Sequence, residues 1–200
     1  REAVVVGATG ELTMTDCLAH DNGKDGFVAD YVIDGVYQNC KAWNNDRHGF
    51  NIVTSTRQFT LQNCLAYDNG GTGCAVQRGS EDIPWCEDVR IDGCEFRGNA
   101  LEGIVIRLAR KITITDTNIQ NNAREGIKLY GADWCLISGN AITNNSALAD
   151  AKYAEVVLRA YDDTGGASGN YYPSLYNIIQ RNSVIDDGDI RAKYGVREYD

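Results

Sequence analysis

Short segments in which apolar and polar residues alternate recur along the whole chain. One set opens with a glycine or a tyrosine, as in the stretch Gly26-Phe27-Val28-Ala29-Asp30. Alternation with a period of two is the pattern of a β-strand that buries one face. The members of this set span residues 26–30, 49–53, 73–77, 103–107, 126–130, 153–158 and 194–197. The sequence therefore predicts a series of short strands with their apolar side chains turned inward.

A second set of strands ends at a repeated phrase, of which 16–23, Asp-Cys-Leu-Ala-His-Asp-Asn-Gly, is one copy. These strands span residues 12–15, 35–38, 59–62, 89–92, 112–115, 136–138 and 177–180. The last asparagine of the phrase recurs at positions 22, 45, 69, 99, 122 and 145, in steps of 23, 24, 30, 23 and 23. A fixed period in the twenties indicates a solenoid, in which stacked coils bury a common core.

The repeat predicts an all-β fold, a right-handed parallel β-helix with two strands in each coil. No stretch shows a sustained 3.6-residue period, and the Leu-x-x-Leu-x-Leu frame of leucine-rich repeats is missing. Asn, Asp and Gly turns let each strand pair with its copy one coil later. We expect residues 1–200 to form one domain. Because the chain starts at Arg1 inside a β-like run, we expect that domain to be a fragment of a longer module.

Two small polar positions of the repeat are predicted to form internal ladders. One position is filled in successive coils by Cys17, Cys40, Cys64, Cys94, Thr117 and Asn140. Buried rungs fit this mixture, because free cysteine is among the most buried residue types; disulfides and a metal site remain the alternatives. The recurring asparagine is expected to adopt a left-handed backbone and to bond to its copy in the next coil. His20 shares a turn position with Trp43 and Tyr67, which predicts a structural role.

Two irregular stretches, residues 78–87 and 162–174, interrupt the repeat. Insertions in solenoids map to loops, often on the binding face. We therefore expect both loops to flank whatever the adjacent face binds.

The glycine-led strands assign an outward face residue by residue, because their inward positions are apolar. At about 4.8 Å per coil, one outward row is roughly 19 Å long. This row contains Asp30, Val53, Gln77, Arg107 and Tyr130, and beside it run Val28, Asn51, Ala75, Val105 and Lys128. Arg47, His48, Arg78 and Arg159 lie in the neighbouring turns.

Charge changes the interpretation of this face. The chain carries 19 basic and 28 acidic residues, a formal net charge of −9, which argues against a nucleic-acid partner. It has no apolar run of 18 residues and no N-terminal export signal, so we expect no membrane association. A cationic strip on an acidic protein attracts an extended anion, such as a polysaccharide. The alternative is a solvated sheet face without a ligand.

Several long runs resemble the catalytic module of bacterial, calcium-dependent mannuronan C-5 epimerases. The runs lie at 25–30, 44–56, 76–80, 100–103, 130–132, 153–158 and 161–164, and the resemblance extends from about Cys17 onward. It implies a right-handed parallel β-helix that converts mannuronate to guluronate in polymeric alginate. It also implies that calcium is the cofactor, that alginate is the partner, and that the protein is secreted; we expect a monomer.

By this resemblance Asp30 matches the family's catalytic aspartate, and further residues match its substrate groove. Those further residues are Arg47, His48, Gln77, Arg78 and Arg107. His48 lies in a turn beside the outward rows, which makes it a second catalytic candidate. The alternative role for His48 is to cap that turn. Asn51, Lys128 and Tyr130 are predicted to contact substrate.

One departure from the family concerns the coil before the Asp30 strand. There the family carries a Tyr and an Asp-Pro-His motif that supply its principal acid and base, whereas residues 1–6 read Arg-Glu-Ala-Val-Val-Val. The alternatives to an epimerase are thus a catalytically incomplete alginate-binding module or a polyuronate lyase. Asp162, Asp163 and 186–189 are the oxygen-rich stretches that could hold calcium, or simply solvated turns.

Overall fold

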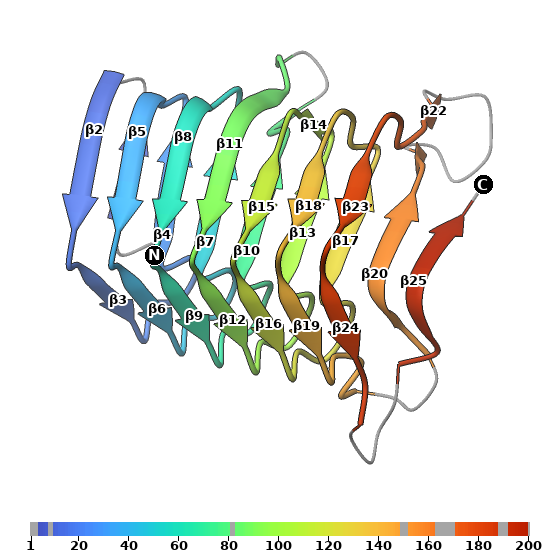
Figure 1. The fold of residues 1–200 in the computed structure, drawn as a ribbon. Coiled ribbons are helices and arrows are strands. Elements are labelled where there is room, and N and C mark those ends of the chain that lie inside the picture. The colour runs from blue at the N-terminus through green and yellow to red at the C-terminus, as the bar shows by residue number, and fades with distance from the viewer. Residues whose placement is uncertain are drawn as a thin grey trace.

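The structure is a computed structural model that describes residues 4–7, 10–80, 83–148, 152–162, 171–187 and 192–199, with the side chains of 4–7 left aside. The described residues form strands, bends and turns, and no helix among them is long and apolar enough to cross a membrane. The coils stack along one axis, with the N-terminal coils at one end and the C-terminal coils at the other (Figure 1).

The strands stack into parallel sheets that run the length of the molecule (Figure 1). The first sheet consists of β1 (Val4–Gly7), β4 (Phe27–Asp30), β7 (Phe50–Val53), β10 (Cys74–Gln77), β13 (Ile104–Arg107), β17 (Ile127–Tyr130), β20 (Ala154–Arg159) and β25 (Tyr194–Tyr199). The second sheet consists of β2 (Gly10–Thr15), β5 (Ile33–Gln38), β8 (Arg57–Gln62), β11 (Cys86–Asp92), β15 (Thr113–Thr115), β18 (Leu136–Ser138) and β23 (Ile178–Gln180), with β14 (Ala109–Arg110) beside β11. Both predicted sets of strands are thereby confirmed.

A third parallel sheet corrects the prediction of two strands per coil. It consists of β3 (Leu18–His20), β6 (Lys41–Trp43), β9 (Leu65–Tyr67), β12 (Glu95–Arg97), β16 (Asn118–Gln120), β19 (Ala141–Thr143) and β24 (Ser183–Ile185). These strands are the repeated phrase that the sequence suggested to be a turn. Three residues are too short to show an alternating pattern, and hydrogen bonds to the neighbouring coils define the strand instead.

The inward side chains of the first sheet form one wall of a continuous core. All ten predicted inward residues have an exposed fraction of 0%. They are Phe27, Ala29, Phe50, Ile52, Cys74, Val76, Ile104, Ile106, Ile127 and Leu129. Full burial of a large apolar side chain stabilises the fold by about 1.5–3 kcal/mol, so this wall fixes the register of the strands.

The cysteine position forms the predicted ladder inside the core. All seven cysteines are free, and six of them are buried. The backbone N–H of Cys64 donates to Sγ of Cys94 at 3.4 Å, and the N–H of Cys94 donates to Oγ1 of Thr117 at 3.3 Å. Burial raises the pKa of the Cys74 and Cys135 thiols. The structure contains no disulfide, and the described residues contain no cluster of metal-binding side chains.

The asparagine position forms a second ladder of buried amides. In each step Nδ2 of one asparagine donates to Oδ1 of the next, at 2.7–3.0 Å. The ladder contains Asn22, Asn45, Asn69, Asn99, Asn122 and Asn145. The expectation of a left-handed backbone at these residues was wrong, because the positive φ belongs to the residue before each, such as Asn44 (φ 52°). This position of the repeat therefore depends on the side-chain amide of asparagine and not on a left-handed backbone.

The ladder ends on a buried carboxyl group, Glu155 in β20. Oε1 accepts the backbone N–H of Asn145 at 2.8 Å, and Oε2 accepts its Nδ2–H at 2.5 Å. Glu155 has no exposed surface. Burial raises the pKa of Glu155 to about 7, so folding favours the protonated form of this group.

We expect the contribution of Glu155 to stability to disappear as the pH rises. A carboxyl group with a raised pKa stabilises the fold fully below its unfolded value of 4.5 and loses this effect through about pH 7. Between pH 4.5 and pH 8, the free energy of unfolding of the native protein should therefore fall by about 3 kcal/mol relative to that of Glu155→Gln. Urea unfolding of both proteins across this range measures the difference, in which the other titrating groups cancel. A pH-independent difference would contradict the prediction.

Candidate functional site

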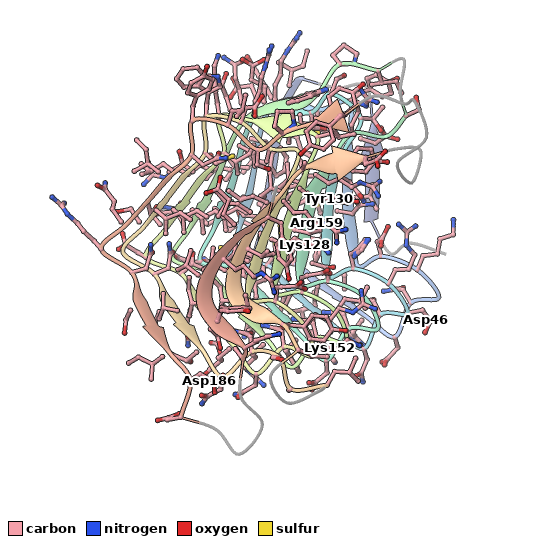
Figure 2. The ribbon with its side chains drawn as sticks, turned by 90° about the vertical axis from the view of Figure 1, so that its right-hand side faces the viewer. Asp46, Lys128, Tyr130, Lys152, Arg159 and Asp186 are labelled. Atoms are coloured by element: carbon pink, nitrogen blue, oxygen red, sulfur yellow. The ribbon has the colours of Figure 1, made fainter. Side chains whose placement is uncertain are left out.

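The outward rows of the first sheet lie where the sequence predicted them. The strand register pairs Asp30 with Val53, Val53 with Gln77, Gln77 with Arg107, and Arg107 with Tyr130. The same register aligns Val28, Asn51, Ala75, Val105 and Lys128. Viewed along the axis, Lys128, Tyr130 and Arg159 lie on the same side of the molecule (Figure 2).

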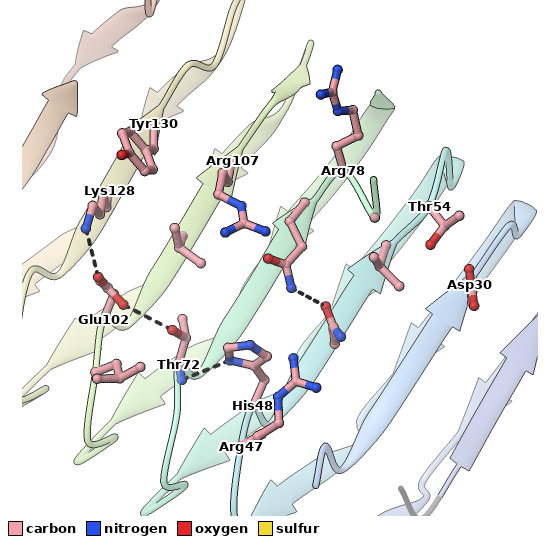
Figure 3. A pocket seen from close by; sticks show the side chains of 16 residues that line it. Asp30, Arg47, His48, Thr54, Thr72, Arg78, Glu102, Arg107, Lys128 and Tyr130 are labelled. Atoms are coloured by element: carbon pink, nitrogen blue, oxygen red, sulfur yellow. Dashed lines mark hydrogen bonds and ion pairs between the residues drawn. The ribbon is translucent and has the colours of Figure 1, made fainter. Parts of the chain in front are cut away.

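A cavity of about 620 Å³ lies over these rows, and we call it the groove. Its lining contains all nine residues that the sequence suggested as catalytic or substrate-binding. The lining consists of Asp30, Arg47, His48, Asn51, Val53, Thr54, Thr72, Gln77, Arg78, Gly79, Leu101, Glu102, Val105, Arg107, Lys128 and Tyr130. Figure 3 shows how these side chains converge from neighbouring coils.

The groove has two walls, one at each end of the strands. Asp30 ends β4 and pairs with Val53, whereas His48 lies five positions before Val53. At about 3.3 Å per residue, Asp30 and His48 are separated by roughly 16 Å along the strand direction. Arg47, His48 and Glu102 therefore form one wall, and Asp30 and Arg78 lie on the other (Figure 3).

A buried network beneath the first wall holds His48 in place. Asp25, which is 1% exposed, accepts the backbone N–H of His48 at 2.9 Å and Nδ2–H of Asn51 at 3.1 Å. Oδ1 of Asn51 in turn accepts Nε2–H of Gln77 at 3.0 Å. These bonds link two neighbouring strands and a turn into one unit, so they fix the floor and the wall relative to each other.

The ring of His48 has a defined proton position. Its Nδ1 accepts the backbone N–H of Thr72 at 3.1 Å, so Nδ1 carries no proton. Burial lowers the pKa of His48, although the Asp25 carboxylate opposes this effect. His48 is thus neutral at pH 7, with its proton on Nε2. His48 therefore lines the groove and also bonds to a turn, while its contact with substrate stays a prediction.

We expect ¹⁵N NMR of the imidazole nitrogens to show this tautomer directly. At pH 7 the His48 spectrum should be that of a neutral ring protonated at Nε2, with a pKa below 6.5. His20→Asn removes the other histidine and assigns the signals. A proton on Nδ1 at pH 7 would contradict the arrangement.

Glu102 is a groove residue that the site prediction missed. Burial alone would raise the pKa of Glu102, but the Lys128 ammonium and a hydrogen bond from Thr72 hold it below its usual value. Nζ of Lys128 lies 3.1 Å from Oε1, and the Thr72 hydroxyl donates to Oε2 at 3.1 Å. The sequence contains a signal that could have identified Glu102. The residue before each strand glycine is polar, as in Asp25, His48, Thr72, Glu102 and Glu125.

Two buried polar atoms in the groove have no hydrogen-bond partner among the described residues. They are Oδ1 of Asp30 and Nε of Arg107. Native proteins satisfy nearly all buried polar atoms, so an unpaired acceptor and an unpaired donor on two residues that line one cavity indicate a ligand site. The Arg107 guanidinium lies 5.9 Å from the centre of the Tyr161 ring.

The described ends of the two inserted stretches meet beside the groove, as expected. The Trp85 and Tyr172 rings contact edge to face at 5.9 Å, and Arg78 lies 5.6 Å from the Tyr172 ring centre. The ring of Tyr161 then connects Tyr172, at 6.3 Å, with Tyr130, at 4.8 Å. These aromatic contacts raise the second wall above the sheet. Residues 81–82 and 163–170 lie outside the described part of the chain.

Strand β1, in the coil before Asp30, contains no residue type that transfers protons. It pairs Gly7 with Asp30 and Val5 with Val28. Its four residues read Val-Val-Val-Gly. The Tyr and the Asp-Pro-His motif that the epimerase resemblance implies are therefore absent from this strand.

The predicted positions His20, Asp162 and Asp186 are not part of the groove lining. His20 is in the third sheet, and its ring stacks on Trp43 at 4.2 Å, so its structural role is confirmed although it lies in a strand. Asp186 lies at another corner of the molecule (Figure 2). Asp163 and Asp189 are outside the described residues, among which no three acidic, histidine or cysteine side chains cluster as metal ligands.

Comparisons with known proteins agree with this architecture. The chain matches the family model of the right handed beta helix region over residues 1–86 and 85–197. It is 45% identical over 190 residues to mannuronan C5-epimerase AlgE5 of Azotobacter vinelandii, a match that covers 95% of this chain and 19% of that protein. Alginate lyase 7 of the same bacterium is 40% identical, with 95% and 22% covered.

A solved structure matches the same region in three dimensions. The A-module of mannuronan C-5 epimerase AlgE6 from Azotobacter vinelandii superimposes with a TM-score of 0.90 and 44% identity. The match covers 96% of this chain and 49% of the A-module. The chain thus resembles mannuronan epimerase A-modules over nearly all its residues, but spans about a fifth of the length of the curated relative and about half of the solved module.

Proposed function

The chain belongs to the right-handed beta helix family, and we propose from this premise that it is an alginate-modifying module of the mannuronan C5-epimerase type. The observation that carries the proposal is the groove, which is lined by Arg107 and Asp30, two residues whose buried Nε and Oδ1 atoms have no partner among the described residues. A uronate residue supplies what both atoms lack, because its carboxylate accepts from an arginine and its hydroxyl groups donate to a carboxylate.

The cations of the groove suit the first chemical requirement of the reaction. Removing the hydrogen at C-5 leaves negative charge on the neighbouring carboxylate, and this charge must be neutralised in the transition state. Arg107 presents a planar fork that matches a carboxylate, and Arg47 and Arg78 line the same cavity. The neutral His48 ring adds a donor, since Nε2–H can hydrogen-bond the developing anion without giving up its proton.

The two walls suit the second requirement, which is access to both faces of the sugar. Inversion at C-5 takes a proton from one face of the ring and returns a proton to the other. A chain that runs along the axis of the β-helix has the Asp30 wall on one side and the His48 wall on the other. Asp30 acts as the base in this proposal, because Oδ1 is an acceptor with no partner among the described residues, and a water molecule on the His48 side returns a proton to the opposite face.

A binding module without turnover is the second candidate, and one observation favours it. Strand β1 carries Val-Val-Val-Gly beside the Asp30 strand, so this strand contributes no acid or base. The cations and hydrogen-bonding groups of the groove would still hold a polyuronate, because charge recognition does not need a proton donor.

Proton NMR of polymannuronate incubated with the protein and calcium distinguishes these functions. We expect guluronate signals with native protein and none with Asp30→Asn. Retardation in an alginate affinity gel without guluronate supports the binding module, and a rise in absorbance near 230 nm identifies β-elimination by a lyase. If the protein shows no turnover and no retardation in the gel, the proposal is overturned.

Calcium and export are part of the proposal through the resemblance to the epimerase family. No step above passes through calcium, because the described residues do not assemble a site for it. Repeating the NMR assay with a chelator should lower the guluronate yield if calcium is required. A polymeric substrate outside the cell implies secretion, which fractionation of the producing cells would check.

A further inference from the structure

One corner of the coil carries two unusual aromatic residues. Just before or within each strand of the second sheet, one residue adopts a left-handed backbone. This row contains Glu11, Asp34, Gln58, Asp88, Lys111, Trp134 and Tyr176, with φ between 52° and 62°. The left-handed region is unfavourable for bulky side chains. The first five coils place polar or flexible residues there, and the last two place a tryptophan and a tyrosine.

These two aromatic residues are exposed and stacked. Trp134 is 58% and Tyr176 65% exposed, and their ring centres lie 4.3 Å apart with 20° between the planes. Most of their apolar surface therefore remains in water, so burial does not compensate for the strained backbone. Strained residues that persist without such compensation often belong to functional sites.

A separate cavity of about 340 Å³ adjoins Trp134, and we call it the corner pocket. Its lining consists of Pro84, Trp85, Arg110, Asp133 and Trp134. Tyr176 comes from the coil after Trp134, whereas Pro84, Trp85 and Arg110 come from the coils before it. Tyr176 stacks on the Trp134 ring and is not part of the corner-pocket lining.

Two aromatic residues line the corner pocket from coils two steps apart. Trp85 and Trp134 are thereby separated along the axis by roughly 9–10 Å at about 4.8 Å per coil. Aromatic rings in a cavity of this kind suit the apolar face of a pyranose.

The polar groups of the corner pocket suit hydroxyl groups. Arg110 donates from Nε and Nη2 to Glu87, at 3.0 and 2.8 Å, which leaves Nη1 without a partner among the described residues. Oδ1 of Asp133 accepts the backbone N–H of Leu175 at 2.9 Å, which leaves Oδ2. One positive donor and one negative acceptor match a hydroxyl group, which both donates and accepts, better than they match an isolated anion.

We propose that the corner pocket is a second carbohydrate site, which holds one pyranose ring of a polysaccharide between Trp85 and Trp134. Arg110 and Asp133 hydrogen-bond the hydroxyl groups of this ring. The site is separate from the groove, because the two cavities share no lining residue. The proposal goes beyond the proposed function and does not depend on it.

Calorimetric titration of native protein and two variants tests the corner pocket. The probes are an oligomannuronate hexamer and cellohexaose, and Arg107→Ala weakens binding in the groove so that the second site is measured alone. In this background Trp134→Gly should weaken binding by roughly tenfold or more, through the loss of stacking. Glycine adopts φ near 57° readily, so the melting temperature should not fall.

The two probes separate the possible sources of the sugar. Loss of oligomannuronate binding with Trp134→Gly identifies a uronate chain, and loss of cellohexaose binding identifies a neutral glucan. Arg110→Ala gives a second variant at an exposed side chain if Trp134→Gly melts early. The proposal is overturned if the Arg107→Ala protein binds neither sugar, or if it binds them equally with and without Trp134. Either result is independent of whether the groove is active.

Discussion

Replacing Arg107 by alanine is expected to weaken alginate binding by about a hundredfold and to abolish detectable turnover. Truncating one partner of a buried, hydrogen-bonded charge pair costs about 2–5 kcal/mol, and Arg107 is the groove cation whose buried Nε has no partner among the described residues. Affinity electrophoresis gives the change in binding, and proton NMR of polymannuronate gives the change in turnover.

Two further variants make this result specific. Arg107→Lys keeps the charge but loses the planar fork, so it should recover only part of the binding. Arg97→Ala removes an arginine from the third sheet, where it pairs with Glu95 at 3.1 Å and lies over Tyr67 at 4.6 Å. This control should leave alginate binding unchanged. Full binding by Arg107→Ala would show that the groove does not hold the polysaccharide.

Replacing Asn122 by alanine is expected to lower the free energy of unfolding by about 3–5 kcal/mol. Its Oδ1 accepts the N–H and Nδ2–H of Asn99, at 3.1 and 2.9 Å. Its Nδ2 donates to the carbonyl of Phe96 at 3.0 Å and to Oδ1 of Asn145 at 2.8 Å. Asn122 is 0% exposed, so water cannot replace these bonds without entering the core.

The neighbouring residue provides the control for the ladder. Asn121 is exposed and has φ 55°, which glycine adopts without strain. Asn121→Gly should therefore change the free energy of unfolding by no more than about 0.5 kcal/mol. Urea unfolding followed by circular dichroism compares the two variants. A loss below about 1 kcal/mol for Asn122→Ala would show that the buried amides do not depend on one another.

The sequence was a good guide wherever the repeat itself carried the information. Once Phe27 was placed inward, the period of two placed Asp30 outward, and the period of the coil aligned it with Gln77 and Arg107. The ladders followed from the same spacing. Each coil repeats the same local pattern, so several copies support every assignment.

The sequence failed where the information was shorter than a period. The three-residue strands of the third sheet, such as β6, show no alternation, so the sequence predicts turns there. The left-handed residue was placed on the ladder asparagine, whereas it is the residue before, as at Asn44 and Asn121. Asparagine serves both purposes, and only the hydrogen bonds and backbone angles separate an amide rung from a bend.

The sequence by itself determined the coil, the core and the outward rows, because a repeated local pattern fixes which face of each strand is buried. Only the tertiary structure decided which turn residues complete the groove, where the His48 proton lies, and that Trp85 and Tyr172 meet. Trp85 and Tyr172 are 87 positions apart, and their contact depends on how separate insertions fold over the stacked coils. No local pattern encodes such a contact, because it arises only when the coils are assembled.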